Sequence, residues 1–172
     1  TGETVLSVPA GAVGELPIAG LADGTYTVAL RSDVPVVASA FSRIGTGAAP
    51  GDFAWSPAAT GVVTLGGAAF WSDPGVTRTA HLVSTGGNST AEVVTVIDGE
   101  PRTRKVELLA DRVATVPLDG ATSVSVRRIT GSGELRGTIV SSGGTGPARV
   151  LSAMSLEESA VTSEVSRAFP PP

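Results

Sequence analysis

Short runs of alternating apolar and polar residues, separated by turns at intervals of about ten residues, constrain the fold of this chain more than any other feature. In Lys105–Ala110 the apolar residues alternate with Lys105 and Glu107, so one side of a strand would face a core and the other would face water. Two similar runs, Val113–Leu118 and Thr122–Arg127, follow directly, each after a turn. The pattern predicts an all-β chain that folds as an antiparallel β-sandwich.

The composition agrees with this fold and excludes several classes of function. The 172 residues include 22 Gly and 12 Pro, which favour many tight turns over long helices. A hydrophobic content of 41% is enough to bury a core. The net charge of −4 provides no basic surface for a phosphate backbone, so we expect no nucleic-acid partner. With no cysteine, neither a disulfide framework nor a cysteine zinc site is available.

We divide the chain into residues 1–75, a first β-sandwich unit; residues 76–154, a second unit; and residues 155–172, a C-terminal segment with a Pro-rich tail. The second unit has seven expected strands, the number in an immunoglobulin-type sandwich. They are Thr79–Val83, Ala91–Ile97, Lys105–Ala110, Val113–Leu118, Thr122–Arg127, Leu135–Val140 and Arg149–Met154. Loosely helical spacing in Ser155–Arg167 would allow one or two turns of helix.

In the first unit the same pattern predicts four longer strands and three short ones. They are Thr4–Val8, Val13–Ile18, Thr25–Leu30 and Val36–Phe41, followed by Phe53–Trp55, Val62–Leu65 and Ala68–Trp71. Pro35 has no amide hydrogen to donate, so the strand after it should lie at a sheet edge or begin just beyond it.

Alternation also assigns side chains to the two faces of the second unit. We expect the apolar set to be buried: Val106, Leu108, Val116, Leu118, Val124 and Val126. We expect the polar set to be exposed: Lys105, Glu107, Ser123 and Ser125.

An internal repeat relates the two units. A gap-free offset of 100 residues aligns Leu6–Gly20 with Val106–Gly120 and matches eight positions by identity or apolar character. Because a slip of one residue would turn every side chain to the opposite face, the two segments should adopt the same strand-turn-strand fold. The first unit then lacks the second unit's two opening strands. Either the chain was trimmed upstream of Thr1, which we favour, or another segment supplies these strands.

An incomplete first unit would leave a sheet edge without a partner. We expect this edge to be covered by the second unit, by Ser155–Phe169 or by another copy of the chain.

The turns and short strands of both halves carry a family resemblance. Ala91–Val96, Asp98-Gly99, Val116–Leu118 and Val124–Val126, with Val8–Gly11 in the first half, resemble an actinobacterial family of exported proteins classed as a domain of unknown function, the family numbered 5719. The resemblance implies an extracellular or cell-envelope β-sandwich protein with no assigned activity and no catalytic residues to transfer. The leader would lie outside this chain, and contact with a membrane would need a segment that this chain lacks.

No catalytic, cofactor or metal site is evident in the sequence. His81 is the single histidine and lies in mid-strand between Ala80 and Leu82, where a structural role is more common than a catalytic one. Asp23, Asp98 and Asp119 each precede a glycine, as turn residues do. No calcium-binding loop and no phosphate-binding loop occurs. We therefore expect no cofactor and no enzymatic activity.

The two aromatic pairs are the candidate ligand-binding residues. Phe53 and Trp55 would share one face of a strand, whereas Phe70 and Trp71 would point to opposite faces. Aromatic side chains in a sandwich more often pack in the core, but exposed ones can stack on sugar rings. We thus expect a non-catalytic structural or protein-interaction module with a protein or cell-wall glycan partner. The alternative is a carbohydrate-binding module, and a hydrolase comes third.

Overall fold

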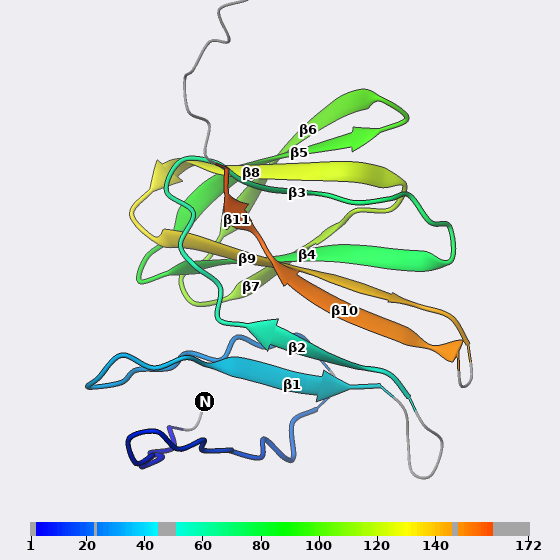
Figure 1. Cartoon of the computed structure of the whole chain (residues 1–172). Coiled ribbons are helices and arrows are strands. Elements are labelled where there is room, and N and C mark those ends of the chain that lie inside the picture. The colour runs from blue at the N-terminus through cyan, green and yellow to red at the C-terminus, as the bar shows by residue number, and fades with distance from the viewer. Residues whose placement is uncertain (1–2, 23, 45–50, 146–147, 160–172) are drawn as a thin grey trace, which may run out of the picture.

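A computed structural model describes residues 3–22, 24–44, 51–145 and 148–159, and within them the chain is built from antiparallel strands without an α-helix (Figure 1). Two sheets form the sandwich. One sheet has four strands in the order β10-β9-β4-β7, and the other has five in the order β11-β3-β8-β5-β6. The prediction of an all-β antiparallel sandwich is confirmed.

The strands of the sandwich run from residue 66 to residue 158. They are β3 (Gly66–Ala69), β4 (Val76–Thr85), β5 (Ser89–Ile97), β6 (Glu100–Leu108), β7 (Val113–Pro117), β8 (Ala121–Gly131), β9 (Glu134–Gly143), β10 (Val150–Ser155) and β11 (Glu157–Glu158). All seven strands predicted for the second unit are present, because each alternating run has a turn at both ends. β3 precedes residue 76 in sequence and hydrogen-bonds to β8, so the sheet begins earlier than the predicted second unit.

The core lies between the two sheets and consists almost entirely of Val, Leu, Ile and Ala. The residues predicted to be buried are buried, except Val106, which is half-buried because β6 is the edge strand of its sheet. Lys105 and Glu107 are exposed as predicted. Ser123 and Ser125 are half-buried and not exposed, since β8 lies between β3 and β5 and its neighbours shield small side chains.

The segment after β10 is extended where the structure describes it. β11 pairs with β3, and Ser159 N–H donates to the Leu65 carbonyl. Residues 160–172, which contain most of the stretch with helical spacing and the Pro-rich tail, lie outside the described residues.

The strand predicted over Val62–Leu65 is wrong, because a side chain takes the place of a neighbouring strand. Val62 makes a single bridge to Leu135. The Glu158 carboxylate accepts hydrogen bonds from the N–H groups of Val63, at 2.7 Å, and Thr64, at 2.8 Å. These bonds lower the pKa of Glu158 below its ordinary value. The segment is therefore a loop held by a carboxylate.

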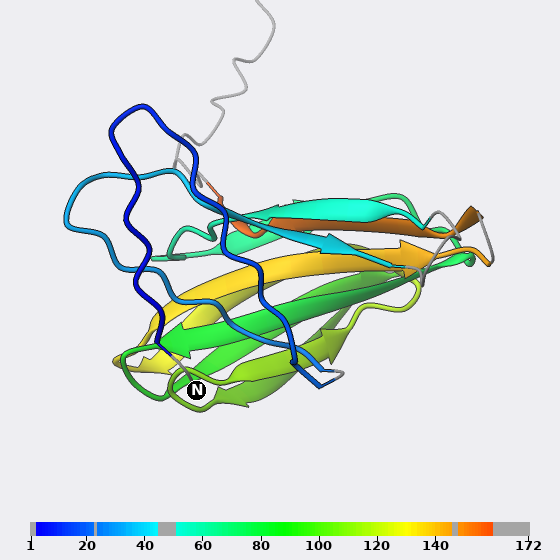
Figure 2. The ribbon, with the colours of Figure 1, turned by 90° about the horizontal axis from the view of Figure 1, so that it is seen from below.

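The N-terminal part of the chain differs most from the sequence prediction. Its only strands are β1 (Ser39–Arg43) and β2 (Phe53–Pro57), which form a two-stranded hairpin among the described residues. β1 begins after Pro35, as expected. The strands predicted over Thr4–Val8, Val13–Ile18 and Thr25–Leu30 are not paired, because no strand lies alongside them to exchange hydrogen bonds. Figure 2 shows this segment as a long irregular path.

The expected cover over the first unit is likewise not found in the described part of the chain. Apolar side chains alternate along Glu3–Val37 as they would in strands, yet they remain exposed. The hairpin contacts the sandwich through β2 against β10 (Figure 1).

Candidate functional site

His81 and the acidic side chains are candidates for acid-base or metal chemistry in the part of the chain that the structure describes. No group of three or more His, Asp or Glu side chains lies close enough to hold a metal ion there. His81, on β4, is flanked in the sheet by Thr115 of β7 and Thr138 of β9. Desolvation by burial lowers the pKa of His81 below its ordinary value of 6.5. A neutral histidine beside two threonines has no carboxylate in register to orient it as a general base.

The lowered pKa of His81 predicts a pH-dependent stability. The unfolded chain binds a proton more readily than the folded one, so stability should fall as the pH drops below about 6.5 toward the folded-state pKa. We expect unfolding in urea to require less denaturant at about pH 5.5 than at about pH 7.5, and His81→Gln to reduce the difference. An imidazole titration by nuclear magnetic resonance with a midpoint at or above 6.5 would contradict this assignment.

The two buried serines have structural partners. Ser89 Oγ donates to Ser84 Oγ at 2.9 Å, and Ser84 Oγ donates to the Gly87 carbonyl at 2.6 Å. Both hydroxyls are therefore used in holding the turn between β4 and β5. Neither is placed next to His81 as a nucleophile would be: Ser84 follows it by three residues, on the opposite face of the strand.

Three aromatic side chains meet on the β1–β2 hairpin, and we call them the aromatic cluster: Phe41, Phe53 and Trp55. The ring centroid of Phe41 lies 5.5 Å from that of Phe53 and 5.0 Å from that of Trp55. Each side chain is more than half exposed. Phe53 and Trp55 share a strand face as predicted, and Phe41 joins them because it pairs with Trp55 across the hairpin.

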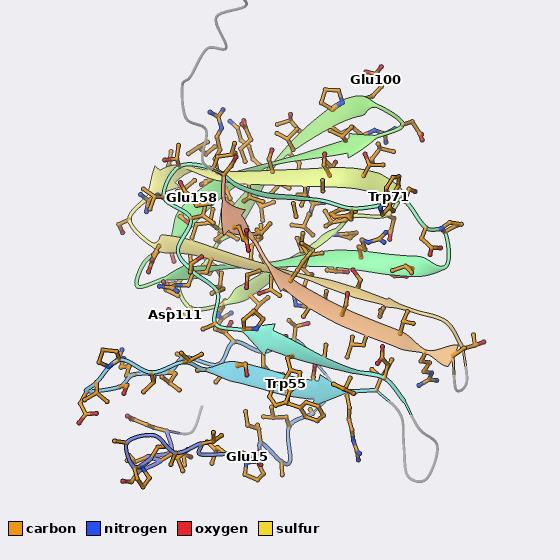
Figure 3. The ribbon with its side chains drawn as sticks, viewed as in Figure 1. Glu15, Trp55, Trp71, Glu100, Asp111 and Glu158 are labelled. Carbon is orange, nitrogen blue, oxygen red and sulfur yellow. The ribbon has the colours of Figure 1, made fainter. Side chains whose placement is uncertain are left out.

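The second aromatic pair does not join this cluster. Phe70 packs against the sandwich core with the Arg78 guanidinium 5.0 Å from its ring centroid, a cation–π distance. Trp71, its neighbour, is 90% exposed. Figure 3 shows Trp55 and Trp71 on separate parts of the molecule. Of the four predicted ligand-binding residues, the structure thus brings together Phe53 and Trp55 only.

A carboxylate links the hairpin that carries the aromatic cluster to the sandwich. Asp52 Oδ2 accepts a hydrogen bond of 2.7 Å from Leu151 N–H on β10, and Asp52 Oδ1 accepts one of 2.9 Å from Phe53 N–H. These two bonds, the one from Leu151 first, lower the pKa of Asp52 below its ordinary value. Ala54, on β2, is buried. The ionised form of Asp52 therefore favours the docked hairpin.

We expect Asp52→Asn to loosen the hairpin without unfolding the sandwich. The amide oxygen is a weaker acceptor than a carboxylate, so the Leu151 N–H should exchange with solvent faster while the urea midpoint of the sandwich stays unchanged. Lowering the pH through the native pKa of Asp52 should have the same effect in the wild-type chain. Asp119→Asn, at an exposed turn, is the matched control. Unchanged Leu151 exchange in Asp52→Asn would show that the carboxylate does not hold the hairpin.

Comparisons with known proteins assign no activity. The model of a family described as "Family of unknown function (DUF5719)" matches residues 1–119. One solved structure, described as "Crystal Structure of Thermotoga maritima 1070", is similar to this chain. The similarity has a TM-score of 0.48 and 9% sequence identity, and it covers 56% of this chain and 95% of that chain. No curated protein matches the sequence. Among the described residues, no helix is long and apolar enough to span a membrane.

Proposed function

We propose that this chain, which belongs to the family of unknown function DUF5719, is a non-catalytic interaction module of an exported bacterial protein acting at the cell envelope. The distribution of exposed apolar side chains carries the proposal. Of the 21 large apolar side chains that are exposed among the described residues, 16 lie between Val5 and Trp55. An apolar surface concentrated in this way is typical of a site that binds another macromolecule.

The other features of the chain support a binding role over a catalytic one. His81 has no carboxylate in register, Ser84 and Ser89 bond to each other, and the described acidic residues form no metal-binding group. The seven strands β4–β10 have the number found in an immunoglobulin-type domain, a common scaffold for binding at cell surfaces. The resemblance to exported actinobacterial proteins supports the location at the envelope.

A carbohydrate-binding module is the second candidate, and the aromatic cluster favours it. Phe41, Phe53 and Trp55 are exposed within 5.5 Å of one another, and aromatic rings so arranged can stack on sugar rings. The rings of Phe41 and Trp55 are tilted by 55° and do not form a flat platform. This geometry suits a packed apolar cluster better than a platform for an extended glycan.

Sedimentation with purified bacterial cell walls, before and after removal of protein by protease, tests the two candidates. The proposed function predicts that binding is lost with the wall proteins and lost in the double variant Leu16→Asp/Ile18→Asp. Trp71→Ala, at the exposed tryptophan outside the aromatic cluster, is the control and should bind as the wild type does. Binding to protein-free glycan that Trp55→Ala abolishes would instead establish the carbohydrate-binding alternative and overturn the proposal.

A further inference from the structure

The 100-residue repeat persists in the backbone where the hydrogen-bonded strands do not. The Ala12 N–H donates to the Pro9 carbonyl at 3.1 Å, and Arg112 N–H donates to the Leu109 carbonyl at 3.2 Å. Positive φ angles recur at the same offset: 74° at Gly11 and 57° at Asp111, and 75° at Gly20 and 71° at Gly120. The segment 3–20 thus keeps the turns of the β6–β7–β8 region without its sheet.

The repeat also extends further along the chain than the aligned sequence window. β1 ends at Arg43 and β9 ends at Gly143, again 100 residues apart, and each strand forms an antiparallel hairpin with the next one. Nine residues separate the paired residues Arg43 and Phe53, whereas six separate Gly143 and Val150. The hairpin β1–β2 therefore corresponds to β9–β10 with a longer loop.

The pairing of the complete sandwich explains which parts of the first repeat form strands. In the second repeat β9 pairs with both β10 and β4, β6 pairs with β5, β7 pairs with β4, and β8 pairs with both β3 and β5. Only the β9–β10 pairing needs no partner from the segment Gly66–Ile97, which contains β3, β4 and β5. The corresponding hairpin, β1–β2, is the one paired element of the first repeat within the described residues.

The exposure of side chains shows which apolar surface is left uncovered because the strands of the first repeat are not paired. Leu16, Ile18 and Tyr26 are 49%, 57% and 49% exposed. The residues 100 positions later, Val116, Leu118 and Val126, are 0%, 2% and 0% exposed. Exposed apolar residues in the first repeat thus occupy positions that form the core in the second.

The aromatic cluster lies on the same interior side. Phe41 corresponds to position 141 of β9, two residues from the buried Ile139 and so on the same face of the strand. Trp55 pairs with Phe41 and shares that face. The cluster therefore belongs to the face that a completed sandwich would cover.

We propose that residues 3–22 and 24–43 form an acceptor for one occupant: a polypeptide segment that supplies three antiparallel strands in the places of β3, β4 and β5. This rests on the proposed interaction function and names its partner. Only a strand presents N–H and C=O groups in the regular row that pairs with the backbone of the predicted strands Val13–Ile18 and Thr25–Leu30; the hydroxyl groups of a glycan do not match this row. A second copy of the chain is a poorer donor, because its own β3–β5 are already paired in its sandwich. Alternating small and branched side chains on the donor, as in Ala80–Leu82 and Ala91–Val93, would meet the exposed apolar face.

A peptide with the sequence of Gly66–Ile97, 32 residues long, is the probe. Peptide and full chain both carry Trp71→Phe, so that Trp55 is the sole tryptophan observed. The peptide in excess should slow amide hydrogen exchange in Val13–Ile18 and Thr25–Leu30 by at least about tenfold. It should also shift the emission of Trp55 to shorter wavelength. A scrambled peptide of the same composition, and the chain variant Ile18→Asp/Tyr26→Asp, should show neither effect.

Three results would overturn the proposal. The first is no protection at about 1 mM peptide, since the dissociation constant would then be well above about 1 mM. The second is equal protection by the scrambled peptide. The third is protection that rises with chain concentration alone, together with a dimer in sedimentation. Peptide docking without binding to wall proteins would leave this inference standing and overturn the proposed function. Binding to wall proteins without peptide docking would overturn this inference and leave the proposed function standing.

Discussion

Replacing Leu108 by alanine is expected to lower the free energy of unfolding by about 2–5 kcal/mol, whereas the same replacement at Leu109 should change it by less than about 0.5 kcal/mol. Leu108 is 1% exposed and lies in the sandwich core, while Leu109, the next residue, is 53% exposed. Removing a core leucine loses its buried apolar surface and leaves a cavity that close packing fills only in part.

Equilibrium unfolding in urea measures both variants, and the pair controls for residue type and position in sequence. Equal costs at the two sites, or a larger cost at Leu109, would mean that the end of β6 presents the opposite face to the core. The repeat supplies a second comparison: Leu118→Ala should be costly and Ile18→Ala should not, since the first is 2% exposed and the second 57%.

Gly131→Ala is expected to destabilise the chain by more than about 3 kcal/mol, because it combines backbone strain with a steric clash. Gly131 ends β8 with a φ of 95°, in a region that residues with a Cβ rarely adopt. An added Cβ would lie against the Asn88 carbonyl oxygen and the Ser89 Cα, closer than non-bonded atoms approach. Neither neighbour can move easily, as both belong to the backbone of the turn and strand beside β8.

Gly86→Ala separates the two contributions. Gly86 also has a positive φ, of 76°, but an added Cβ there would meet nothing within 4 Å. It should cost only the dihedral strain, about 1–2 kcal/mol. If urea unfolding gave the same loss in free energy of unfolding for Gly131→Ala as for Gly86→Ala, β8 would not approach the β4–β5 turn as closely as described.

The strands of the second repeat could be predicted from the sequence because its local pattern and its long-range pairing agree. Each alternating run from Thr79 to Met154 has a neighbouring strand within the chain. Each run therefore forms a strand that is hydrogen-bonded to that neighbour. In Thr4–Leu30 the same alternation predicted strands that are not formed, since alternation specifies which side of a strand is apolar but not whether a partner strand is present. β3 was predicted two residues late, over Ala68–Trp71, and β11 was not predicted, because two- to four-residue strands rich in Gly or Glu carry almost no periodic signal.

The candidate site was predictable in part for a similar reason. The shared face of Phe53 and Trp55 follows from the two-residue period of a strand. Phe41 joins them through the hairpin register, which depends on a loop whose length alone does not fix the pairing. The Asp52–Leu151 contact joins residues 99 positions apart and has no local signal in the sequence.

Amide hydrogen exchange on the full chain tests most directly the central claim that the chain holds one complete sandwich and one repeat without its partner strands. Leu118 N–H donates to the Arg78 carbonyl, and Val126 lies in the middle of β8 between β3 and β5. We predict exchange at these two amides at least about a thousandfold slower than in an unstructured peptide. Ile18 and Tyr26, 100 positions earlier, should exchange at nearly the unstructured rate. Comparable protection at Ile18 and Leu118, or at Tyr26 and Val126, would contradict the account, because the first repeat would then already be paired.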